Sequence, residues 1–209
     1  MLGVPLFVLR KVEMSLFLDA AKVWLQLIDV SYEITIGRRN KKEIIRLTFQ
    51  MEDFDHLSGI QYAKDIDFRL PRKKYRGDQL IPALLNNKIA ANQIEKSEKW
   101  GDIKTRLQAI ICLQKLLDTD FDIYEFNPNK LRFHTSIKAA YCIYSKELDC
   151  GIFLFIDKTS GRFYCKSIFQ KDGRNFTENQ TAWTVLKKDR CQNGMQVNLF
   201  TKDTYKAES

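Results

Sequence analysis

The sequence contains no apolar run long enough to cross a bilayer. Positive charges follow its apolar start, residues 1–9, whereas a secretory signal has them in front. The 5 cysteines are odd in number and include no CxxC pair, so neither a disulfide framework nor a zinc site is indicated. These absences predict a cytoplasmic protein that makes no contact with a membrane.

The sequence also lacks the common catalytic motifs. It has no glycine-rich phosphate loop, no GxSxG, no HExxH and no acidic residues spaced for a two-metal site. A basic protein with so few metal-ligand clusters is better suited to metal-free chemistry on an anionic substrate. We therefore expect no metal and no cofactor.

Basic residues are in excess. Lys and Arg number 34 against 26 Asp and Glu, a formal net charge of +8, and such an excess makes nucleic acid a natural partner. Apolar residues make up 44% and charged residues 29% of the chain, a mixture typical of globular proteins. A chain of this length is expected to bury one large core, so we predict a single domain over residues 1–209.

Hydrophobic periods divide the chain into two parts. A period of three to four residues predicts helices over about residues 13–118, interrupted by one β-hairpin at 31–50 where the period changes to two. Alternating runs joined by turns predict strands over about 121–190, and residues 191–209 are expected to form a C-terminal tail. Because consecutive strands with short connections pair antiparallel, the predicted fold class is α+β, with N-terminal helices and a small hairpin followed by a C-terminal antiparallel β-meander.

Several short segments follow one another along the chain. They are Phe54-Asp-His-Leu-Ser-Gly-Ile60 after the predicted strand end Leu47-Thr-Phe49, then Ser136-Ile-Lys-Ala-Ala-Tyr141, Tyr164-Cys-Lys-Ser-Ile-Phe169, Asn179-Gln180 and Leu186-Lys-Lys188. In type and order they resemble phage-encoded nucleases of the Barnase–EndoU–colicin–RelE-like (BECR) fold, over roughly residues 15–190. The resemblance implies a BECR-like fold and metal-independent RNA cleavage. It also implies a protein that is toxin-like or is borne by a phage or mobile element, and an inhibitor protein is a further expected partner.

Metal-independent cleavage requires a base for the ribose 2′-hydroxyl, an acid for the leaving 5′-oxygen, and cations or donors for the phosphoryl oxygens. His56 is the first candidate, because an unperturbed histidine titrates near pH ~6.5. The alternative for His56 is a structural role near Gly59. The resemblance adds Lys138 as a cation for the transition state, with a solvated strand-end lysine as the alternative. Ser167 is a hydroxyl donor or a small core residue, and Gln180 is a phosphate or base ligand or the end of a loop.

The clearest electrostatic feature is a basic loop around one tyrosine, which suits phosphate contacts together with stacking on a base. The RNA-binding candidates are Arg69, Arg72, Lys73, Lys74, Tyr75, Arg76 and, on a predicted strand, Lys166. A second basic cluster at the predicted hairpin tip consists of Arg38, Arg39, Lys41 and Lys42. A solvated surface is the alternative explanation for each run. Strand alternation places Lys166 on the face opposite Ser167, unless a bulge reorients one of them.

These observations predict a metal-independent endoribonuclease that cleaves RNA by 2′-hydroxyl attack. The alternative is a non-catalytic basic protein on the same scaffold that binds RNA or another protein.

Overall fold

The computed structural model describes residues 6–65, 75–89, 91–145, 151–159 and 161–206, without the side chains of residues 6–15 and 91. The helices are α1 (Leu6–Leu27), α2 (Asp53–Ser58), α4 (Leu80–Leu85), α5 (Ala91–Ile94), α6 (Trp100–Ile111) and α7 (Leu113–Asp118), with 3-10 turns η1 (Ile60–Tyr62), η2 (Gly77–Gln79) and η3 (Pro128–Lys130). The strands are β1 (Val30–Arg38), β2 (Lys41–Thr48), β3 (Asp122–Glu125), β4 (Tyr141–Ser145), β5 (Ile152–Thr159), β6 (Arg162–Gln170), β7 (Thr181–Gln192) and β8 (Met195–Thr201).

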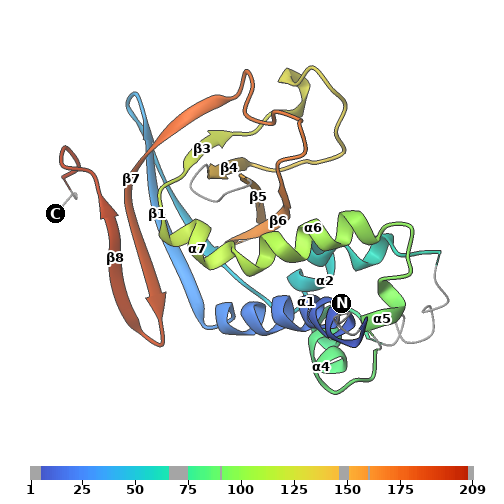
Figure 1. Ribbon diagram of the computed structural model, residues 1–209. Coiled ribbons are helices and arrows are strands. Elements are labelled where there is room, and N and C mark those ends of the chain that lie inside the picture. Colours follow the sequence, from blue (N-terminus) through green and yellow to red (C-terminus); the bar gives the residue numbers. More distant parts are fainter. Residues whose placement is uncertain (1–5, 66–74, 90, 146–150, 160, 207–209) are drawn as a thin grey trace, which may run out of the picture.

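The helices gather on one side of the sheet (Figure 1). On α1, Phe17, Ala20, Trp24 and Leu27 recur at intervals of three and four residues and are all buried, so this stripe is the face that meets the core. α1 packs against α6, and α6 packs against β6. The helical layer is thereby joined to the sheet mainly through one strand.

Seven strands close into a ring in the order β1, β2, β6, β5, β4, β3, β7. β7 closes it by pairing with β1 from Val30↔Gln192 to Gly37↔Thr184. The pairings are antiparallel except for β2–β6, which is parallel and meets at Leu47↔Phe163. β8 lies outside the ring on β7 (Figure 1). The architecture is a mixed seven-stranded barrel with one further strand and a few helices.

The predicted α+β layout of N-terminal helices, a small hairpin and an antiparallel meander is therefore wrong. The hairpin is part of the sheet, because β1 pairs with β7 and β2 pairs with β6. Burial explains this, since Ile34, Ile36, Ile45 and Leu47 are fully buried and a two-stranded hairpin alone covers little apolar surface. Closure also pairs the backbone groups on both outer edges of the hairpin, which would otherwise be exposed.

The C-terminal residues also join the sheet. β7 runs on to Gln192 and β8 follows a tight turn at Asn193–Gly194, within the segment 191–209 that was predicted to be a tail. The amide of Lys202 then donates to the carbonyl of Leu186 at 2.8 Å, which returns the chain to β7. Residues 202–205 consequently lie beside β7 and the tip of the β1–β2 hairpin.

A bulge in β6 changes which side chains share a face. Two consecutive β5 residues pair with Cys165 and Ser167, so the intervening Lys166 has no partner of its own. The extra residue reverses the alternation, and Ser167 therefore faces the same side as Tyr164. The ammonium of Lys166 also reaches this side, because its Nζ donates to the Tyr164 hydroxyl at 3.2 Å. The bulge thus places Lys166 and Ser167 together, which strict alternation would not allow.

The core has two parts, one on each face of β5 and β6. The larger part, which includes the helices, takes Leu154 and Ile156 from β5. The smaller part is aromatic and takes Phe155 from β5 and Phe169 from β6, whose ring centroids lie 5.6 Å apart, with Phe176 from the following loop. Ser167 lies on the aromatic face.

Candidate active site

Three elements, α2, α6 and β6, converge at one place (Figure 1). They contribute His56 from α2, Arg106 from α6, and Lys166 and Ser167 from β6, with Gln61 from the turn after α2. We name these five residues the His56 cluster. Two of the predicted residues, His56 and Ser167, and the predicted RNA-binding Lys166 therefore lie in one region of the molecule.

A two-pronged ion pair fixes α2 on β6. The two terminal nitrogens of Arg162 donate to the two carboxylate oxygens of Asp53 at 2.9 and 3.1 Å. This hydrogen-bonded carboxylate raises the pKa of Arg162. Asp53 lies in the first turn of α2, where a negative charge is also favoured by the helix dipole. Because His56 follows Asp53 in the same short helix, the ion pair also holds the backbone of His56 against β6.

The imidazole of His56 is held toward its neutral form. Partial burial of the ring lowers its pKa most, and the charges of Lys166 and Arg106 lower it further, against the opposite effect of Asp55 and Asp53. A pKa below the ordinary value of about 6.5 leaves most of the ring unprotonated at pH 7. Since the residue remains exposed on one side, the neutral ring is able to accept a proton from a bound substrate.

The side-chain amide of Gln61 contacts one ring nitrogen. Its Nε2 lies 3.3 Å from Nδ1 of His56 and donates to the His56 carbonyl at 3.2 Å. Its Oε1 is buried and has no hydrogen-bond partner among the described residues. This contact leaves Nε2 of His56 for a substrate. Rotation of the amide would place Oε1 against a protonated Nδ1, which is the tautomer in which Nε2 acts as a base.

Arg106 is a partly buried cation that forms no ion pair with a carboxylate in the described part of the chain. Its Nη1 donates to Oγ of Ser167 at 3.2 Å, and its guanidinium lies 5.5 Å from the ring centroid of Tyr62 and 5.7 Å from that of Phe169. Burial lowers the pKa of Arg106 most and the charge of Arg174 lowers it further, against the opposite effect of Tyr62 and of the Asp102 carboxylate. Arginine nevertheless stays charged in proteins. The side chain is therefore available to an anionic group such as a phosphate.

Gly59 permits the close approach of α2 and Arg106. It ends α2 in the left-handed conformation, with φ 75°. A Cβ at this position would lie 2.7 Å from Cδ of Arg106. The position therefore favours glycine for two reasons, the backbone conformation and the space.

Lys166 lies between a hydroxyl and a carboxylate. Besides its hydrogen bond to Tyr164, its Nζ lies 3.8 Å from Oδ2 of Asp157. Its charge acts on His56 without a direct hydrogen bond between them. The Tyr164 hydroxyl is thus placed at the edge of the cluster beside a cation.

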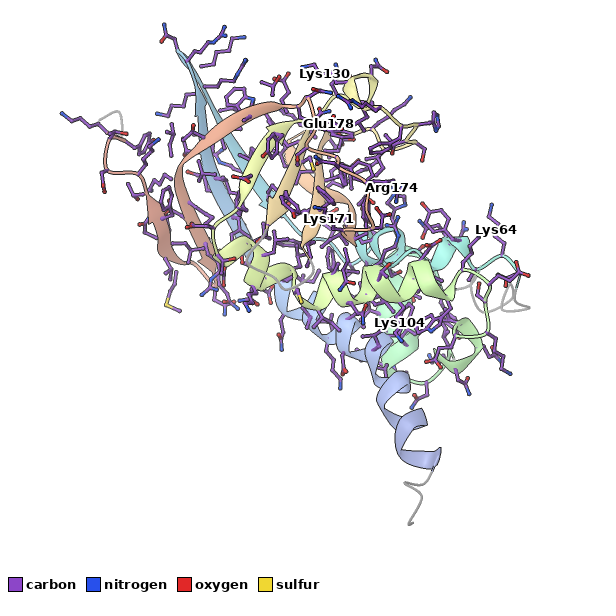
Figure 2. The ribbon with its side chains drawn as sticks, turned by 45° about the horizontal axis from the view of Figure 1, so that its top comes forward. Lys64, Lys104, Lys130, Lys171, Arg174 and Glu178 are labelled. Carbon is purple, nitrogen blue, oxygen red and sulfur yellow. The ribbon has the colours of Figure 1, made fainter. Side chains whose placement is uncertain are left out.

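Further cations lie on the same side of the molecule. Figure 2 shows Lys171 and Arg174, from the loop after β6, above α6, and Lys104 on α6 itself. Arg174 pairs with Asp172, and its guanidinium lies 5.8 Å from the ring centroid of Phe169. An anionic substrate that approaches the His56 cluster from this side therefore meets positive charge.

The other two predicted catalytic residues have no contact with the cluster among the described residues. Oε1 of Gln180 accepts from the amide of Asn127 at 2.7 Å, and its Nε2 donates to the carbonyls of Asn127 and Glu178, so Gln180 joins two loops. Lys138 is exposed in the segment before β4, and none of the described residues forms an ion pair or hydrogen bond with its side chain. The catalytic roles of both residues stay predictions.

Only one end of the predicted RNA-binding loop is described. Arg69, Arg72, Lys73 and Lys74 lie outside the described residues. Tyr75 packs against the larger core, and Arg76 is exposed. The amide of Gly77 donates to Oδ2 of Asp55 at 3.3 Å. Because Asp55 precedes His56, this end of the loop is attached directly beside the cluster.

Sequence reasoning missed Arg106, Gln61 and the pairing of Arg162. Arg106 lies beside the apolar stripe of a predicted helix. This position was the only signal in the sequence that its cation is partly buried. Its partner Ser167 is 61 residues away in the sequence. Local periodicity contains no information on such a contact, so this residue was found only through the tertiary structure.

The described ranges contain no group of three or more His, Cys, Asp or Glu side chains placed to hold a metal ion. In those ranges no helix is both long and apolar enough to cross a membrane.

The fold and the His56 cluster define a basic protein that places a largely neutral histidine beside cations. Residues 16–203 match the model of the phage-Barnase-EndoU-ColicinE5/D-RelE like nuclease 4 family. The chain belongs to this nuclease family, which confirms the resemblance seen in the sequence. No curated protein and no solved structure matches the chain.

Proposed function

We propose that the His56 cluster is the active site of a metal-independent endoribonuclease. The observation that supports this most is a histidine of lowered pKa close to Arg106, a cation that forms no ion pair with any described carboxylate. Attack of a 2′-hydroxyl on the adjacent phosphate needs both groups at once. The base removes the proton, and the cation receives the charge that develops on the phosphoryl oxygens.

Each member of the site has a separate task in this proposal. His56 accepts the 2′-hydroxyl proton, and Arg106 and Lys166 bind the non-bridging oxygens. The Tyr164 hydroxyl donates a proton to the leaving 5′-oxygen, so the products are a 2′,3′-cyclic phosphate and a 5′-hydroxyl. Ser167 is a positioning residue, because its hydroxyl holds Arg106. These steps use neither a metal nor a cofactor.

The remaining predicted residues extend the same proposal. We propose Lys138 as a further cation for the transition state and Gln180 as a ligand of the RNA. The basic loop would follow the RNA backbone from its attachment beside His56. We also propose that the protein is cytoplasmic, that it is toxin-like or of phage or mobile-element origin, and that an inhibitor protein controls it.

The test is cleavage of end-labelled RNA by the purified protein with and without EDTA. We expect His56→Ala to lower kcat at least about a hundredfold and to leave RNA affinity nearly unchanged, because a proton-transfer group acts mainly in the transition state. His134→Ala is the matched control, since His134 is the second of the 2 histidines and is exposed. Its activity should equal that of the wild type.

Two results would contradict the proposal. Full activity of the His56→Ala variant would reject the site, and complete loss of activity in EDTA would reject the metal-free mechanism. Binding without cleavage of any RNA would favour the alternative, a non-catalytic RNA-binding protein.

A further inference from the structure

A second basic feature lies at the tip of the β1–β2 hairpin, away from the His56 cluster. It is a surface pocket of about 470 Å³ between the hairpin tip, β7 and the returning C-terminal segment. The lining residues are Gly37, Arg38, Arg39, Asn40, Lys41, Lys42, Ala182, Thr184, Leu186 and Lys202. We name it the hairpin pocket. Figure 1 shows the hairpin tip at the end of the molecule opposite α4 and α5.

The hairpin pocket is lined by cations and by no acidic residue. Five of the ten lining residues are Lys or Arg. In the described part of the chain no carboxylate forms an ion pair with Arg38, Arg39, Lys41 or Lys202, whereas Lys42 lies over the ring of Tyr205 at 5.2 Å. Like charges brought together around one cavity repel one another unless an anion occupies it. The pocket is therefore chemically suited to a polyanion.

The backbone of Arg39 gives a second, independent observation. The hairpin turns through Arg39 and Asn40, because Arg38 pairs with Lys41. Arg39 has φ 53°, in the left-handed region that glycine and asparagine occupy more readily than arginine. Turn formation alone thus does not explain an arginine here. A long cationic side chain at this position is better explained by what it binds.

We propose that the hairpin pocket binds backbone phosphates of the single-stranded substrate outside the scissile bond. This inference rests on the proposed function, because it assigns the pocket a part of the same nucleic acid. The two features are joined along β2, from Lys41 in the pocket to Leu47, which pairs with Phe163 beside Arg162. Six residues of a strand span about 20 Å. Only a strand of several nucleotides would reach both features, so the pocket adds affinity for longer substrates.

The variant Arg39→Gly is suited to testing this proposal. It removes one cation and replaces the left-handed arginine by the residue that adopts this conformation most easily. The melting temperature should therefore stay the same or rise, which separates lost binding from lost folding. Combination with Lys41→Gln removes a second cation, and Lys88→Gln with Lys96→Gln, two exposed lysines of the helical layer, is the control of equal charge.

Binding is measured by fluorescence anisotropy with a 12-nucleotide RNA and a DNA of the same sequence, in a His56→Ala background and between 50 and 200 mM salt. We expect Arg39→Gly/Lys41→Gln to raise Kd roughly tenfold at low salt and to reduce the slope of log K against log salt by about 0.7 for each lost phosphate contact. RNA and DNA should lose affinity alike, because the contacts are to phosphates. The lysine control should retain its affinity.

Unchanged affinity and slope in the pocket variant would overturn the inference, and so would an equal loss in the lysine control. Cleavage by proteins that keep His56 separates this result from the proposed function. If binding falls as expected but the wild type cleaves no RNA, the pocket stands and the proposed catalytic function fails. If the pocket variant cleaves and binds like the wild type, the pocket fails and the catalytic site stands.

Discussion

The His56 cluster and the hairpin pocket are both basic, but they hold their cations differently. In and beside the cluster each cation has a specific partner, Asp53 for Arg162, Ser167 for Arg106 and Tyr164 for Lys166. In the pocket four exposed or half-exposed cations have no described carboxylate partner. Catalysis requires fixed distances, whereas attraction of a polyanion requires only charge. The difference predicts that mutations in the two regions affect different quantities.

The largest effect is expected from Arg106→Ala. Removal of a positioned donor that acts on developing charge should lower kcat by about 10²–10³-fold, while RNA affinity changes little. Arg39→Gly should show the reverse, a weaker Kd with an unchanged kcat. Single-turnover cleavage at saturating protein measures the first quantity, and anisotropy measures the second. A similar loss of affinity in both variants would remove the distinction between the two regions.

A smaller effect is expected from Gly59→Ala, which tests whether the cluster depends on close packing. The left-handed backbone costs about 1–2 kcal/mol for a residue with a Cβ, and the new methyl group also displaces Arg106. The matched control is Gly194→Ala, because Gly194 has φ 77° and a Cβ there would meet nothing within 4 Å. Urea denaturation gives both stability losses. We expect only Gly59→Ala to lower kcat as well, by roughly tenfold, since small displacements of positioned groups slow catalysis.

The smallest effect is expected from Lys166→Met, which should shift the pH dependence of kcat/KM. The charge of Lys166 lowers the pKa of His56, so its removal should raise that pKa. In the proposed mechanism the neutral ring is the active form, and the acidic limb of kcat/KM should therefore move to higher pH. NMR titration of the imidazole protons gives the same pKa directly, because the chain has only 2 histidines. Lys138→Met serves as the control, and an equal shift there would place Lys138 beside His56 and change the composition of the cluster.

Sequence reasoning succeeded where the signal was local and failed where it was not. The apolar stripe on α1 and the alternation in β1 are visible within a few residues, and so is the basic hairpin tip. The pairing of β2 with β6 at Leu47↔Phe163 is not visible locally, because the sequence of neither strand indicates which strand it pairs with. The side-chain alternation at Ser167 was misleading for a similar reason. A bulge is decided by packing against the neighbouring strand, and only the pairing of β5 with β6 shows it.

For the candidate site, the sequence showed which residue type suits the chemistry, but it did not show which residues the fold brings together. His56 stood out as one of 2 histidines that can exchange a proton near pH 7. Arg106 was one of 34 basic residues, and its distinction comes from burial beside Ser167. The sequence therefore singled out His56 by residue type, whereas the cation beside it became visible only in the folded chain.

The pairing of Val30 with Gln192 has a consequence for folding during synthesis. Strand β1 is synthesised well before β7, so the ring cannot close on the ribosome until β7 has emerged. The ion pair that fixes α2 likewise joins residues 109 positions apart. Long-range pairings of this kind form slowly, because the entropy of loop closure is lost before the contacts compensate for it. A nascent chain therefore has no assembled His56 cluster before β6 and β7 have been synthesised.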